Sequence, residues 1–176
     1  FGGMGYVAGL IDQAFHFDGD NAGVAIPAGA NLNVGLSNGL TIECWINPMD
    51  VTAERPLVEW NDGAGFIGAH FWLSPTNGLG GGGPGALYAN LVDTNGTYHI
   101  IASAPTVVTV TNYQHVAVTY SQLTGDAILY LNGSPVQTRN LGAFTPATAF
   151  DLYLGHRPSG VASKAFYWGD LDEVSI

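Results

Sequence analysis

The segment from residue 115 to residue 136 limits most strongly what this chain can fold into. Val116, Val118 and Tyr120 alternate with small or polar residues, and this period of two is typical of a half-buried strand. A turn at residues 123–126 leads into a second apolar run that ends at Asn132-Gly133. Asn-Gly is a strong hairpin signal because both central residues of that turn need positive φ. The segment therefore predicts an antiparallel meander of two strands and the start of a third.

The rest of the chain shows the same pattern of short strands separated by turns. Further strands are predicted at residues 14–18, 24–27, 40–47, 56–60, 65–73, 86–92, 97–103, 107–110, 150–155 and 165–176. Residues 1–9 form a lead-in, residues 28–38 a loop with room for one helical turn, and residues 78–85 a glycine-rich loop. No segment has the period of an amphipathic helix. The sequence thus predicts an all-β fold, an antiparallel two-sheet β-sandwich.

Length and charge narrow the classes of function. The 176 residues fit a single domain spanning 1–176. The net charge is −10 and Lys164 is the only lysine, which argues against nucleic acid as a partner. No run of about 18 apolar residues is present, so we expect no membrane insertion. Cys44, the only cysteine, alternates with Ile42 and Ile46 and is expected to be a buried thiol. Since the chain opens on Phe1 without a signal-like segment, we expect a domain excised from a longer chain.

Five motifs in order resemble one family. His115-Val116-Ala117-Val118-Thr119-Tyr120 followed by Leu129-Tyr130-Leu131-Asn132-Gly133 is similar to the central signature of laminin-G-like jelly-roll domains, which belong to the concanavalin-A-like lectin/glucanase superfamily. The other motifs lie at residues 9–19, 40–48, 152–155 and 169–176. The resemblance implies a concanavalin-like jelly roll from a secreted or cell-surface protein. With the lack of a disulfide, it also indicates a bacterial origin.

The same resemblance implies a structural calcium ion that joins the first and last motifs. Its expected ligands are Asp18 and Asp172, with Asp20 and Asn21 assisting. Asp172 shares strand parity with Val174, so we expect it to point toward the apolar side, where a carboxylate needs a partner. The alternative is that Asp18 caps its own turn and Asp172 accepts backbone N–H groups or an arginine.

Aromatic and amide side chains supply a second candidate site, for sugars. His70 and Trp72 share one face of a predicted strand, whereas Phe71 and Leu73 share the other, and only one face can be core. Exposed aromatic rings stack on sugar rings, and amides bind hydroxyl groups. The candidate ligand-binding residues are Trp60, His70, Trp72, Tyr88, Asn90, His99, His156, Arg157 and Trp168. Any one of these aromatics could alternatively be core or rim packing.

Catalytic patterns are weak. A glycosidase needs two facing carboxylates, but in residues 170–173 Glu173 lies opposite Asp170 and Asp172, and Glu43 and Glu59 are isolated. We therefore expect no enzyme but a carbohydrate-binding module with a glycan partner. The alternative is an adhesion or structural domain whose partner is a surface protein or a second copy. A glycoside hydrolase or polysaccharide lyase is the third hypothesis.

Overall fold

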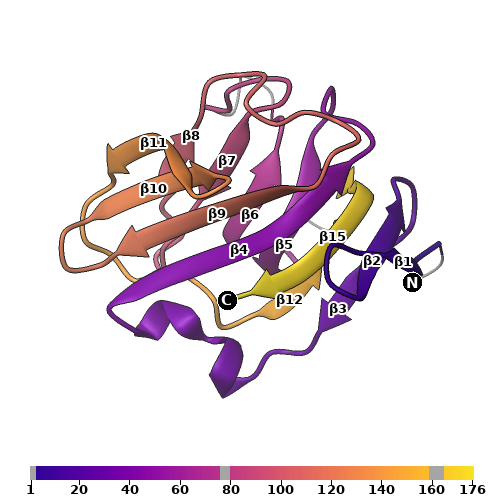
Figure 1. Ribbon diagram of the computed structural model, residues 1–176. Helices are drawn as coiled ribbons and strands as arrows, with labels where there is room; N and C mark the ends of the chain where they lie inside the picture. Colours follow the sequence, from indigo (N-terminus) through magenta and orange to yellow (C-terminus); the bar gives the residue numbers. More distant parts are fainter. Residues whose placement is uncertain (1–2, 76–79, 159–164) are drawn as a thin grey trace.

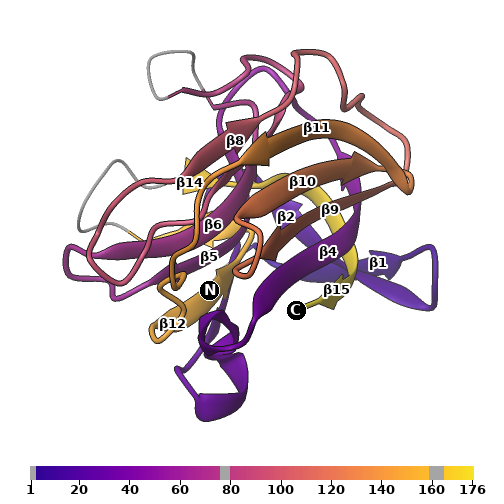
Figure 2. The ribbon, with the colours of Figure 1, turned by 90° about the vertical axis from the view of Figure 1, so that its left-hand side faces the viewer.

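The computed structural model describes residues 3–75, 80–158 and 165–176 and has two antiparallel sheets stacked face to face (Figures 1 and 2). The predicted all-β sandwich is therefore confirmed. Lys164 and residues 78 and 79 of the predicted glycine-rich loop lie outside the described residues. No helix in the described part of the chain is long and apolar enough to cross a membrane.

The first sheet has seven strands. In spatial order they are β1 (Gly5–Ala8), β2 (Gln13–Asp18), β15 (Trp168–Ser175), β4 (Gly39–Pro48), β9 (Gln114–Ser121), β10 (Asp126–Leu131) and β11 (Ser134–Asn140). The last strand in the sequence thus lies between the second and the fourth.

The second sheet has six strands. In spatial order they are β3 (Val24–Ile26), β12 (Asp151–Leu154), β5 (Arg55–Asn61), β6 (Ile67–Leu73), β7 (Leu87–Asn90) and β8 (Ile100–Ala102). A small ribbon pairs β13 (His156–Arg157) with β14 (Ala165–Phe166), and two 3₁₀ turns, η1 (Ala30–Leu32) and η2 (Val34–Leu36), precede β4.

The meander that the sequence predicts is present as β9, β10 and β11. Asn132 and Gly133 join β10 to β11 with φ values of 49° and 77°, which are the positive angles that this turn requires. The alternating residues Leu40, Ile42, Cys44 and Ile46 of β4 face the core together with Val116 and Val118 of β9. Alternation along each strand therefore places one apolar face of each sheet against the other.

Three expectations were wrong. Residues 5–8, assigned to the lead-in, form β1, because they pair with residues 13–16 of β2. Residues 107–110, predicted as a strand, contain none, and bends occupy residues 107, 108 and 110 instead.

The third error concerns Asp172. Asp172 of β15 pairs with Trp45 of β4, and Ser175 pairs with Glu43. Two residues of β15 therefore lie between these pairs but only one residue of β4, so β15 contains a bulge. Glu173, within the bulge, has a φ of 49°. The extra residue reverses strand parity. Leu171 and Val174 both face the core, and Asp172 points to the other side.

Candidate functional site

A row of polar and aromatic side chains crosses the outer face of the six-stranded sheet. Tyr153 of β12 lies opposite Glu59 of β5, Glu59 opposite His70 of β6, and His70 opposite Asn90 of β7. Their strand neighbours, such as Phe71 and Leu152, belong to the core, so these four side chains, the outer row, face away from it. Adjacent strands are roughly 4.8 Å apart, so the outer row spans about 14 Å.

A buried ion pair organises this face. The Arg157 guanidinium donates to both oxygens of Glu59, with Nε 2.9 Å from each and Nη2 2.7 Å from Oε2. Glu59 also accepts from Asn61 Nδ2 at 2.8 Å and from Trp72 Nε1 at 3.0 Å, and its side chain is fully buried. The guanidinium carbon lies 4.0 Å from the centre of the Trp72 ring. We call the outer row together with Asn61, Trp72, Tyr88 and Arg157 the outer-face cluster.

The small ribbon of β13 and β14 holds Arg157 in place. Both of its strands contact β5. His156 stacks on Phe166 with ring centres 4.8 Å apart and lies 5.9 Å from the ring of Tyr153. His156 therefore borders the outer-face cluster, and the ribbon lies beside Tyr153 and Glu59 at one end of the outer row.

The outer-face cluster carries no net charge near neutral pH. Burial lowers the pKa of His70, while the Glu59 carboxylate opposes this shift and Arg157 reinforces it. Burial raises the pKa of Tyr88 to about 12, so its phenol stays protonated. The His70 ring lies 5.8 Å from Trp72 and 5.9 Å from Tyr88. A neutral imidazole, a phenol and amides beside a compensated ion pair can exchange hydrogen bonds with hydroxyl groups.

Tyr98 extends this face to the protein surface. Ile100 lies opposite Asn90 and Ala102 opposite Tyr88, and Tyr98 has the same parity as both. Its side chain is 64% exposed, and repulsion between the Tyr98 and Tyr88 phenolates contributes to the raised pKa of Tyr88. Tyr98 is therefore an open aromatic surface beside buried hydrogen-bonding groups.

The structure brings together only part of the predicted sugar site. His70, Trp72, Tyr88, Asn90 and Arg157 share the outer face. Trp60 points into the core, fully buried, and donates its indole N–H to the Leu32 carbonyl at 3.2 Å, so we remove it from the candidate set.

Two further candidates lie elsewhere. His99 points to the opposite side of its strand, where it stacks on Phe144 with ring centres 3.6 Å apart and has Nε2 3.3 Å from Asp93. Trp168 is on β15 of the other sheet, opposite Asp18. The backbone N–H of His99 does donate to Asn90 Oδ1 of the outer-face cluster at 3.1 Å, but the imidazole ring packs on Phe144 instead.

Asp18 organises its own turn. One of its oxygens accepts the backbone N–H groups of Asp20, Asn21 and Ala22 at 2.9, 3.0 and 3.0 Å. These hydrogen bonds lower the pKa of Asp18, and the bond from Asp20 has the largest effect. Asp172 instead accepts the N–H groups of Leu10 and Ile11 at 2.7 and 3.1 Å. These contacts are those of the alternative interpretation, turn capping and backbone anchoring.

One calcium ion cannot bind both aspartates in this arrangement. Asp18 pairs with Trp168, four residues before Asp172 on the same strand, a spacing of about 13 Å. Calcium ligands lie roughly 2.3–2.6 Å from the ion, so two ligands of one ion lie within about 5 Å of each other. Among the described residues, no group of three or more His, Cys, Asp or Glu side chains is placed to hold a metal. The residues do not fit the expected bridging site.

The sequence did not single out several members of this face. Glu59 appeared isolated because its partner Arg157 is 98 positions away. Asn61, Tyr153 and Tyr98 were missed as well. Alternation with the core residues Val58, Trp60, Leu152 and Leu154 would have assigned Glu59, Asn61 and Tyr153 to the outer face, but strand order was needed to bring them together.

Comparison with a family model supports the motif analysis. Residues 18–176 match the laminin-G-like family described as the concanavalin A-like lectin/glucanases superfamily. No curated protein sequence matches the chain.

Solved structures share the fold at low identity. Domain 4 of an extracellular arabinanase from Geobacillus stearothermophilus, solved with arabinotriose, has a TM-score of 0.66 at 15% identity. The match covers 99% of this chain and 74% of the arabinanase chain. A carbohydrate-binding module of a Ruminococcus gnavus sialidase, solved with α2,3-sialyllactose, has a TM-score of 0.61 at 17% identity over 88% of each chain. Mouse laminin α1 domains LG4-5 have a TM-score of 0.65 at 13% identity. The match covers 92% of this chain and 40% of the laminin chain.

Proposed function

Because the chain belongs to the laminin-G-like family of the concanavalin A-like lectin/glucanases superfamily, we propose that it is a non-catalytic carbohydrate-binding module of a secreted or cell-surface protein. Two solved structures of this fold that hold oligosaccharides support the proposal, one with arabinotriose and one with sialyllactose.

The observation that carries the proposal is the outer-face cluster beside Tyr98. A buried ion pair adds little to stability compared with apolar residues of the same volume, so Glu59 and Arg157 are poorly explained as filling. As a scaffold, the pair fixes the Trp72 indole and the Asn61 amide by direct hydrogen bonds. A sugar ring stacked on Tyr98 would place its hydroxyl groups toward Asn90 and Tyr88.

The same geometry supports binding without catalysis. Glycoside hydrolysis by the common mechanism needs two carboxyl groups on either side of the scissile bond. Within the described residues, Glu59 is the single carboxylate of the outer-face cluster, and four hydrogen-bond donor atoms from three residues already occupy its two oxygens. It has neither a partner carboxylate nor a free lone pair aimed at a ligand.

Binding is tested by glycan array and then by calorimetry with the best ligand, starting from arabino-oligosaccharides and sialyllactose. We expect Tyr98→Ala to weaken binding about tenfold, a loss of about 1.4 kcal/mol, and to leave the melting temperature unchanged because the ring is exposed. Tyr6→Ala is the matched control, because Tyr6 is 61% exposed but lies on β1 of the other sheet.

Two results would contradict the proposal. One is an array with no signal at high protein concentration. The other is a glycan whose affinity falls in Tyr6→Ala and not in Tyr98→Ala, which would move the site to the seven-stranded sheet.

A further inference from the structure

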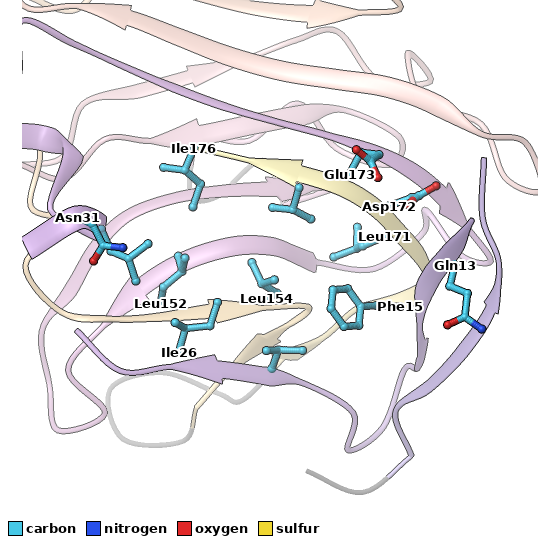
Figure 3. A pocket seen from close by; sticks show the side chains of 13 residues that line it. Gln13, Phe15, Ile26, Asn31, Leu152, Leu154, Leu171, Asp172, Glu173 and Ile176 are labelled. Carbon is cyan, nitrogen blue, oxygen red and sulfur yellow. The ribbon is translucent and has the colours of Figure 1, made fainter. Parts of the chain in front are cut away.

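A hollow lies between the two sheets at one open edge of the sandwich, away from the outer-face cluster. It has a volume of about 660 Å³ and lies between β3 and β12 of one sheet and β2 and β15 of the other (Figure 3). Ligand pockets in proteins usually measure roughly 300–1,000 Å³. The hollow, which we call the edge pocket, is therefore large enough for a small molecule.

The unequal sheets explain why the edge pocket exists. Tyr6 of β1 lies opposite Phe15 of β2 and so faces the same inner side, yet its ring is 61% exposed. The seven-stranded sheet thus extends past β3, the edge strand of the six-stranded sheet. Without an opposing strand, Phe15, Val24 and Ile26 stay only partly buried.

Apolar side chains form the walls, and polar side chains lie at the ends. Figure 3 shows Phe15, Ile26, Leu152 and Leu154 along the walls of the hollow, with Asn31 near one end and Gln13 near the other. The bulge at Glu173 completes this arrangement, because it brings Val174 into the lining while leaving Asp172 and Glu173 at the rim. Such a surface suits an amphiphile with its apolar body inside and its polar group at the rim.

Charge selects the kind of amphiphile. The lining contains two carboxylates, Asp172 and Glu173, and no lysine or arginine among the residues that the structure describes. The whole chain carries a net charge of −10. A ligand carboxylate at this rim would be repelled, whereas an ammonium group would pair with the exposed Glu173.

We propose that the edge pocket binds a small cationic amphiphile, an apolar chain or ring system that carries an amine. A peptide strand added to the free edge of β3 is less suited, because β3 has only three residues and offers few backbone hydrogen bonds. This site is separate from the outer-face cluster, so either proposal can fail alone.

The test uses three probes with the same chain: n-octylammonium, 1-octanol and octanoate, each titrated below its aggregation limit and followed by amide chemical shifts. We expect saturable shifts at residues of β2, β3, β12 and β15, with n-octylammonium binding about two- to fivefold more tightly than 1-octanol, as expected for one exposed ion pair. Octanoate should bind most weakly.

Two variants locate the site. Ile26→Trp should fill the edge pocket and abolish binding, and it should fold because Ile26 lies on an edge strand and is only half-buried. Val136→Trp on β11, at the far edge of the other sheet, is the matched control and should bind like the wild type. Glu173→Gln should make n-octylammonium and 1-octanol equal.

Three outcomes would overturn the proposal. They are no saturable binding of any probe, octanoate binding as tightly as n-octylammonium, and unchanged binding in Ile26→Trp. Binding of an alternating valine–lysine peptide without binding of n-octylammonium would also overturn it, in favour of strand addition.

Discussion

At the scale of single residues, the outer face shows how burial controls protonation. His70 is nearly inaccessible to water, and its Nδ1 lies 2.9 Å from the Gly68 carbonyl oxygen. Burial is the main cause that lowers its pKa below the usual 6.5. In the folded protein the imidazole therefore stays neutral at pH values where an exposed histidine gains a proton.

This shift predicts a loss of stability in weak acid. As the pH falls below about 6.5, the unfolded chain binds a proton at His70 before the folded chain does, so unfolding becomes more favourable. We expect the free energy of unfolding of the wild type, relative to His70→Gln, to fall by up to about 1.4 kcal/mol per pH unit below that point. Urea unfolding of both proteins from pH 8 to pH 5 measures the difference.

The internal control is the range above pH 7.5, where His70 is neutral in both states and the difference should not change. A difference that is flat down to pH 5 would contradict the assignment of a neutral buried imidazole.

At the scale of elements, Asp172 connects the two ends of the sequence. It accepts the backbone N–H groups of Leu10 and Ile11 in the loop between β1 and β2, and it is 3% exposed. Gly9 is needed beside it, because a Cβ atom there would lie 2.6 Å from a carboxylate oxygen of Asp172. This carboxylate therefore anchors the first hairpin to the last strand.

Removing this anchor should loosen the first hairpin. We expect Asp172→Ala to lower the free energy of unfolding by about 1.5–3 kcal/mol, because two part-buried hydrogen bonds lose their charged acceptor. Limited proteolysis should then cut at residues 9–12 before the rest of the chain. Asp126→Ala, at an exposed hydrogen bond in β10, is the control and should cost under about 1 kcal/mol.

A chelator distinguishes backbone anchoring from calcium binding at Asp172. The free energy of unfolding lost in Asp172→Ala should be the same with and without a chelator. A cost that disappears when chelator is added to both proteins would assign this carboxylate to a cation instead.

Signals between neighbouring residues predicted the single strands and turns well, but they did not predict which strands lie side by side in the sheets. The alternation in β4 and β9 and the Asn132-Gly133 turn act between neighbours in the sequence, and the structure confirms them. The bulge at Glu173 gives no such signal, so the side to which Asp172 points was predicted wrongly. The outer-face cluster depends on which strands lie side by side, and turn chemistry does not determine that order. Five of the eight members of the outer-face cluster were therefore among the predicted residues, but the pairing of Arg157 with Glu59 was not predicted.

At the scale of the whole molecule, one continuous core holds both sheets together. Cys44 lies within it, fully buried between core residues of both sheets. Burial, with a contribution from Glu43, raises the pKa of its thiol to about 12. Since the reactive species is the thiolate, the folded protein should resist thiol reagents at ordinary pH.

Cys44 therefore reports opening of the whole domain. At pH 8 we expect Ellman's reagent to label Cys44 only at the rate of global unfolding, and this rate should rise with urea in parallel with the loss of circular dichroism. Ser134→Cys, on the exposed strand β11, is the control and should react at once. Rapid labelling of Cys44 in native protein would show that the two sheets separate locally.

The position of β15 between β2 and β4 also has a mechanical consequence. The chain enters β1 at the end of this part of the sheet where Gly5, His16 and Asp170 are neighbours, and it leaves β15 at the opposite end, beyond Ser175. Tension applied through β1 and β15 would therefore act along the strands and in opposite directions. Under such shear the hydrogen bonds between β1, β2 and β15 share the load instead of opening one after another, and the domain would bear force along its chain as a single block.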